Sequence, residues 1–166
     1  MTVSFAARVS MLVASIACSS VAFAAIPPGS GTLSGSEKVT VTRCGKDSGA
    51  ANVDFAIASD GSWSATIDGN TYLGSSVANA NGRIVQLTMG NGSFALFTQV
   101  MTDSASDLCG EVVGVSTLSI TKALLKVNKR LTAAKLQLQA GASGSAASGS
   151  GHGKYQLKAS GAWQVP

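Results

Sequence analysis

Four Asp-Gly or Asn-Gly pairs between residues 60 and 92 separate short runs in which apolar and polar residues alternate. In the clearest run, Val53, Phe55 and Ile57 alternate with small or polar residues. Alternation with a period of two is typical of a strand that buries one face. Glycine, with Asp or Asn before it, readily adopts the positive φ angles of tight hairpin turns. The pattern therefore predicts a mainly β protein: a single antiparallel meander domain that closes into a barrel-like or sandwich-like structure.

At Ser93 the spacing of the apolar residues changes from that of a strand to that of a helix. From there, apolar residues including Phe97 and Met101 recur at helical spacing, and polar residues fill the other side. Ser93 is a suitable N-cap and Gly110 a suitable C-terminal stop. We therefore expect one helix over residues 93–109.

Residues 1–24 have the pattern of a secretory signal peptide. Arg8 precedes an apolar run, and small residues at Ala22 and Ala24 occupy the positions that signal peptidase inspects. We expect cleavage after Ala24 and a secreted or periplasmic protein. Two less favoured alternatives are an uncleaved membrane anchor and a lipoprotein attached through Cys18.

Two cysteines, Cys44 and Cys109, follow the expected cleavage site. In an oxidising compartment such a pair most simply forms one disulfide bond. The bond would tether the end of the predicted helix to the first strand. Two thiolates without a nearby histidine do not complete a tetrahedral zinc site, so we expect no metal site here.

A sequence repeat decides the interpretation of residues 120–140. Their apolar residues fit either a helix or strands, but KLQLQA at 135–140 returns as KYQLKA at 154–159, where the strand pattern is clearer. We therefore favour strands over residues 124–128 and 134–140, with a helix as the alternative. The Gly/Ser/Ala tract between the repeats is expected to join their two strands, which extend into it. His152, the only histidine, is placed in this loop, without a partner to orient it.

The expected domain organisation has three parts. After the signal peptide, residues 25–36 are rich in Pro, Gly and Ser and form a lead-in, and residues 37–166 form a single β-rich domain. The first strand is expected at residues 37–43. A chain of this length supports one modest core.

The motifs of common enzyme classes are missing from the sequence. There is no G-x-S-x-G elbow, no G-x-x-x-x-G-K-[ST] phosphate loop, no dinucleotide fingerprint and no C-x-x-C pair. Glycosidase chemistry needs two positioned carboxylates, whereas most aspartates here fall in predicted turns. We therefore expect a non-enzyme with no catalytic residue, cofactor or metal.

The charge distribution is the most unusual compositional feature. Residues 25–121 contain four basic and all eight acidic residues, whereas seven basic residues and no acidic one follow. These seven define the predicted basic surface: Lys122, Lys126, Lys129, Arg130, Lys135, Lys154 and Lys158.

Two function classes compete on these grounds. The favoured one is an exported, non-enzymatic binding or structural protein of the cell envelope or extracellular space. Its basic surface would contact an anionic envelope component or a protein partner, and nucleic acid is not expected. The alternative is a carrier of a small apolar ligand in a β-barrel cavity. The first requires the seven cations on one surface, and the second requires an apolar cavity.

Overall fold

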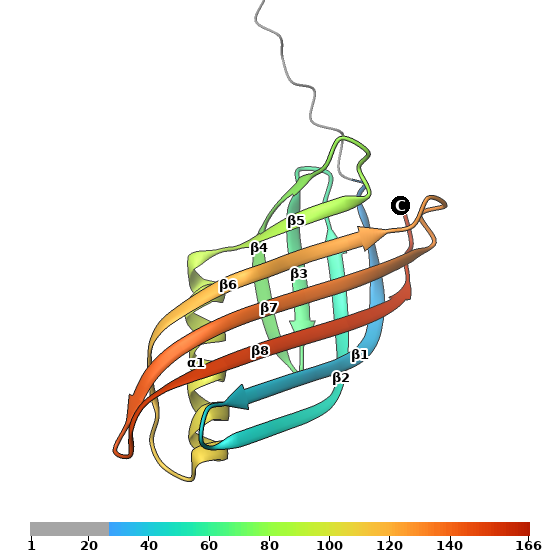
Figure 1. The fold of residues 1–166 in the computed structure, drawn as a ribbon. Coiled ribbons are helices and arrows are strands. Elements are labelled where there is room, and N and C mark those ends of the chain that lie inside the picture. Colours follow the sequence, from blue (N-terminus) through green and yellow to red (C-terminus); the bar gives the residue numbers. More distant parts are fainter. Residues whose placement is uncertain (1–26) are drawn as a thin grey trace, which may run out of the picture.

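Each strand pairs with the next one along the chain, and the last strand returns to pair with the first. A computed structural model describes residues 27–166 and shows a closed, antiparallel, eight-stranded barrel with one helix (Figure 1). The predicted signal peptide and Cys18 lie outside the described residues. The strands are β1 (Gly29–Val41), β2 (Gly45–Ile57), β3 (Ser62–Ile67), β4 (Asn70–Ala78), β5 (Ile84–Met89), β6 (Gly114–Val127), β7 (Ala133–Ala146) and β8 (Gly149–Ala162). The mainly β meander is confirmed, and it closes as a barrel.

Three of the four predicted glycine turns are confirmed. Gly61, Gly69 and Gly82 all have positive φ angles, and Asp68 before Gly69 has one as well. The fourth pair, at residues 91–92, is instead the start of the helix. It follows β5 directly, so the chain leaves the sheet here and does not reverse into a hairpin.

The helix α1 (Asn91–Cys109) confirms the predicted change of period, although it begins earlier than residue 93. Ser93 is not its N-cap, which is Gly90. The hydroxyl of Ser93 is buried and accepts a hydrogen bond from the backbone N–H of Leu73 at 2.6 Å. Gly110 ends the helix in the left-handed conformation, as predicted, with φ of 65°.

The helix lies across the region that the shorter strands β3, β4 and β5 leave uncovered. It contacts β1, β2, β4 and β6, and it buries Phe97, Met101 and Ala105 (Figure 1). A disulfide bond between Cys44 and Cys109 joins its C-terminal end to the β1–β2 turn, which confirms the predicted pairing. Within residues 27–166, no helix combines the length and apolar character needed to cross a membrane.

The strands predicted within residues 120–140 are confirmed. The chain turns between β6 and β7 where Asn128 bonds to Thr132 and Ala133. One detail differs: the predicted strand at 124–128 is the end of a longer strand, β6, which begins at Gly114 and continues through a register shift between Ile120 and Lys122.

The two strands extend into the Gly/Ser/Ala tract, as expected, and they occupy almost all of it. β7 and β8 stay paired out to Ala146 and Gly149, so only a tight turn remains between them. His152 therefore lies within β8, exposed and opposite Ser143, and its placement in a loop was wrong. Small residues allow this pairing because neighbouring backbones exchange hydrogen bonds whatever the side chains are.

The barrel begins inside the predicted lead-in, because β1 starts at Gly29. The glycines of this segment are needed where β8 crosses β1 closely. A Cβ atom added at Gly31 would lie 2.1 Å from the carbonyl oxygen of Ala162, and one at Gly35 would lie 1.9 Å from that of Lys158. The Gly-rich composition thus reflects close strand contact at the point of closure.

Candidate functional site

The interior of the barrel contains a cavity of about 360 Å³, here called the barrel cavity. Its size lies within the range of roughly 300–1,000 Å³ that is usual for small-molecule sites. Apolar and aromatic side chains from β2 to β7 and from α1 form most of its wall. They are Phe55, Trp63, Ala65, Ile67, Tyr72, Leu87, Met89, Phe94, Phe97, Ile120, Ala123, Leu136 and Leu138.

The barrel cavity opens sideways, between β5 and β6. These strands pair over three residues only, 84–86 with 124–126, whereas β6 and β7 pair along almost their whole length. Beyond this short contact the chain enters α1 from β5, and β6 carries its register shift between Ile120 and Lys122. The polar lining residues on the two strands define the cavity mouth: Gln86, Thr88, Thr121 and Lys122.

Trp63 is held firmly in the cavity wall. Its Nε1 donates hydrogen bonds to the backbone oxygens of Ser75 at 2.9 Å and Thr88 at 3.2 Å. Its ring stacks on Phe55, with centroids 5.8 Å apart and planes 10° apart. Gly74 leaves room for it, since a Cβ there would lie 2.7 Å from Trp63 Nε1. This part of the wall is therefore formed without a ligand.

Phe97 closes the cavity on the side of α1. Its ring meets Tyr72 and Tyr155 edge to face, with centroid distances of 6.0 and 5.1 Å. Edge-to-face contacts of this kind stabilise a packed aromatic cluster beyond the area that they bury. The helix is thus fixed to the barrel by ring packing as well as by the disulfide bond.

A second hollow, of about 500 Å³, lies on the other side of these rings, between α1 and strands β1 to β4. Glu37, Asp47, Asp68 and Asp107 line it, and we call it the acidic hollow. The hydroxyl of Tyr155 donates a hydrogen bond to Glu37 Oε2 at 3.0 Å. No group of three or more His, Cys, Asp or Glu side chains among residues 27–166 has the arrangement of a metal site.

The titratable groups of the acidic hollow are shifted by burial. Burial raises the pKa of Glu37 above its ordinary value of 4.5, and the nearby Asp68 and Asp47 raise this pKa further. The hydrogen bond from Tyr155 lowers it, but not enough to cancel the rise. Burial, with the negative charges of Glu37 and Asp68, also raises the pKa of Tyr72 to about 12. The pKa of Tyr155 rises for the same reasons, so both phenols stay protonated at neutral pH.

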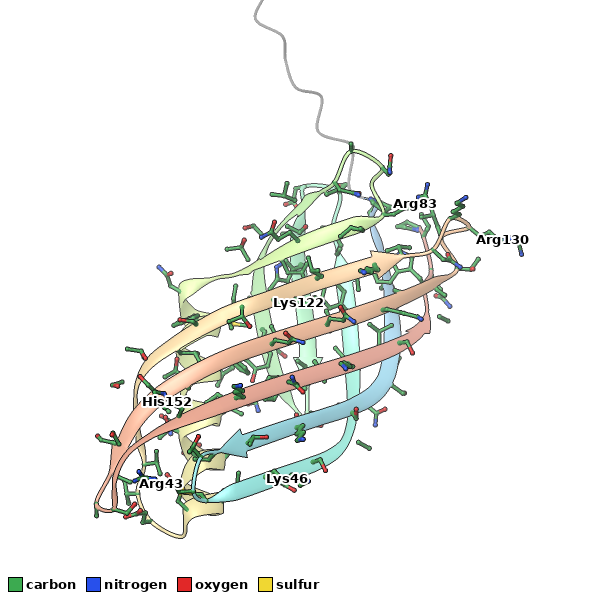
Figure 2. All side chains as sticks on the ribbon, in the orientation of Figure 1. Arg43, Lys46, Arg83, Lys122, Arg130 and His152 are labelled. Atoms are coloured by element: carbon green, nitrogen blue, oxygen red, sulfur yellow. A yellow bond between two sulfur atoms is a disulfide. The ribbon has the colours of Figure 1, made fainter. Side chains whose placement is uncertain are left out.

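The seven cations of the predicted basic surface all lie on β6, β7, β8 or the β6–β7 loop. Six are exposed, and Lys122 is half-buried at the cavity mouth. Lys126 and Lys135 face each other across β6 and β7. Figure 2 shows Lys122 on β6 and Arg130 in the loop at the end of this sheet, with Arg83 nearby. Lys38 joins the same region, since it lies on β1 opposite Gln156 of β8.

Sequence reasoning missed the cavity mouth and the Glu37–Tyr155 contact. Gln86 and Thr88 have the ordinary appearance of outward-facing strand residues, and only the early separation of β5 from β6 makes them line an opening. The sequence did contain an indication of the Glu37 contact. Glu37 is two residues before the buried Val39, so both side chains lie on the same face of β1. An acidic residue at an inward position indicates a buried polar contact.

No protein-family model matches the chain, and no match was found among curated proteins or solved structures.

Proposed function

We propose that this chain is a non-enzymatic binding protein that holds a small apolar ligand inside its barrel. The observation that carries the proposal is the barrel cavity of about 360 Å³, with its apolar wall and its opening between β5 and β6. Eight-stranded barrels have an interior that either fills with side chains or holds one small ligand. The sequence alone ranked this function second, and the cavity moves it to first place.

The preformed wall favours binding. Trp63 and Phe55 are already stacked, and Trp63 is fixed by two hydrogen bonds. A ligand would not have to order these side chains, which lowers the entropic cost of association. Burial of apolar ligand surface would supply the favourable free energy, at roughly 25 cal/mol per Å².

The proposal is tested by filling the cavity. Ala123 lines it and is half-buried near the mouth, so the substitution Ala123→Phe places a ring in the space that a ligand would take. Binding of an apolar fluorescent dye such as 1-aminoanthracene should weaken at least about tenfold, since the phenyl ring excludes the ligand from an apolar site of this size. Native mass spectrometry of gently purified protein would reveal a retained ligand.

Ala133→Phe is the matched control. It adds the same ring at an exposed position at the start of β7, and dye binding should not change. Circular dichroism checks that both variants keep the β fold. Equal dye binding by the parent chain and a folded Ala123→Phe variant would show that the dye does not enter the cavity.

A second candidate function is supported by a different observation, the gathering of seven cations on β6 to β8. Like charges directly opposite each other, as at Lys126 and Lys135, destabilise a sheet. An anionic component of the cell envelope would relieve that repulsion. We propose this contact as a means of localising an exported protein in a secreted or periplasmic setting. The disulfide bond is compatible with an oxidising compartment.

A further inference from the structure

Apart from Gln137 on β7, the polar residues that line the barrel cavity are those of the cavity mouth, and the rest of the wall is apolar. Among the described residues that line the barrel cavity, Lys122 is the only charged one. It lies on β6 next to the point where β5 departs, and Gln86 and Thr88 face the opening from β5. The site thus has two chemically different parts, an apolar interior and a cationic entrance.

The strands around the mouth do not neutralise Lys122. No acidic residue occurs in β5, β6, β7 or β8, and Lys126 and Lys135 add positive charge along the same sheet. No acidic residue among those that the structure describes lines the barrel cavity, whereas Glu37, Asp47, Asp68 and Asp107 line the acidic hollow beyond the ring of Phe97. The electrostatic potential at the mouth is therefore positive and attracts an approaching anion.

We propose, on the basis of the function proposed above, that the ligand is a single-chain amphiphile with an anionic head group. Its apolar chain lies in the barrel cavity, and its head lies between β5 and β6 against the ammonium group of Lys122. Gln86 and Thr88 offer further hydrogen-bond donors to the head group. A carboxylate and a phosphate monoester share this chemistry.

The head group decides affinity through its charge. A charge-assisted hydrogen bond from an ammonium is stronger than a neutral one, and Lys122 is half-buried, so solvent screens it less than it screens the exposed lysines. A neutral alcohol with the same chain forgoes this contact. A quaternary ammonium head meets repulsion and offers no hydrogen-bond acceptor.

The test compares probes with one chain and different heads: decanoate, decyl phosphate, decanol and decyltrimethylammonium. Affinities are measured with the full chain by displacement of 1-aminoanthracene and by the intrinsic tryptophan fluorescence, to which Trp63 in the cavity wall contributes. Decanoate and decyl phosphate should bind roughly tenfold more tightly than decanol, and the cationic probe most weakly. The order of decanoate and decyl phosphate then shows which anion the mouth prefers.

Lys122→Gln should reduce the affinity for both anionic probes to that for decanol and leave decanol unchanged. Lys126→Gln is the control, since it removes an exposed cation from the same strand away from the cavity lining. Equal binding of anionic and neutral probes would overturn the head-group inference while the proposed function stands. Equal losses in both lysine variants would overturn the role of Lys122. If no probe binds the parent chain, the proposed function itself fails.

Discussion

At the scale of single residues, Glu37 is the least expected feature of the barrel. It occupies an inward position of β1 and is half-buried, where a carboxylate loses much of its hydration. The hydrogen bond from Tyr155 offsets part of this cost. The negative charge nevertheless stays close to Asp68 and Asp47. Glu37 therefore destabilises the folded state whenever it is ionised.

Glu37→Gln should stabilise the protein at neutral pH. Because the folded state raises the pKa of Glu37 above 4.5, the folded chain binds this proton more tightly than the unfolded chain does. Stability is therefore lost as the pH rises through the interval between 4.5 and the folded pKa, and the loss is complete above it. Glutamine avoids the loss and still accepts the hydrogen bond from Tyr155. Urea unfolding below pH 4.5 and at neutral pH measures the difference, which should vanish in acid.

Asp54→Asn provides the comparison. Asp54 is exposed and also accepts a hydroxyl hydrogen bond, from Thr32 at 2.7 Å, so the same chemical change is made outside the hollow. It should show much less dependence on pH. A gain in stability for Glu37→Gln that is equally large in acid would mean that burial of its charge is not the cause.

At the scale of secondary-structure elements, α1 governs the shape of the cavity. The chain enters it from β5 and leaves it for β6, so the helix separates two strands that pair over only three residues. Phe97 packs against Tyr72 and Tyr155, and the disulfide bond holds the other end at the β1–β2 turn. The helix is thus both a wall of the cavity and the reason for its mouth.

Removal of the disulfide bond should cost about 4 kcal/mol of unfolding free energy, because the bond closes a long loop in the unfolded chain. Its two cysteines are 65 residues apart. The double variant Cys44→Ser, Cys109→Ser is compared with the parent chain in urea unfolding, with and without a reductant. The parent should be destabilised by the reductant to the level of the variant, and the variant should not respond to it. Alkylation of both cysteines in the untreated protein would contradict the bond.

At the scale of the whole molecule, charge is segregated. The basic surface occupies β6 to β8 and their loop, and the acidic hollow lies between α1 and strands β1 to β4. Residues far apart in the sequence, such as Lys129 and Lys158, share the basic region because β6, β7 and β8 are neighbours in the barrel. Such a distribution orients the molecule toward an anionic surface.

Replacement of Lys126, Lys129, Arg130 and Lys135 by glutamine should abolish binding to anionic lipid vesicles at physiological salt. Exposed charges are screened over about 8 Å under these conditions, so binding depends on several cations acting together. All four are exposed, and the fold should persist. Vesicle sedimentation at low and physiological salt measures the effect, and an anionic polysaccharide replaces the vesicles in a second series.

The control replaces Arg43 and Lys46 by glutamine. These cations lie at the other end of the barrel from Arg130 (Figure 2), and their removal should weaken binding far less for each charge removed. Unchanged binding of the fourfold variant would remove the basic surface as a cause of association.

The sequence by itself determined the local structure. Alternation of apolar and polar residues marked the strands, and Gly61, Gly69 and Gly82 marked turns because few other residues adopt their positive φ. The change to helical spacing located α1, and two cysteines after the predicted signal peptide determined the disulfide pairing. These patterns involve residues close together in the sequence, so they can be recognised without knowing which strands pair.

Only the tertiary structure decided closure, the cavity and its mouth. Whether β1 pairs with β8 depends on strand tilt and register. The sequence alone placed Gly31 and Gly35 in a lead-in, whereas the structure shows that the backbone of β8 passes close to both glycines. In the sequence, Lys122 is one of seven predicted surface cations. In the structure it lies at the cavity mouth, because the pairing of β5 with β6 ends beside it. A period-two pattern says which face of a strand is buried, whereas the neighbours of that face are fixed by long-range pairing.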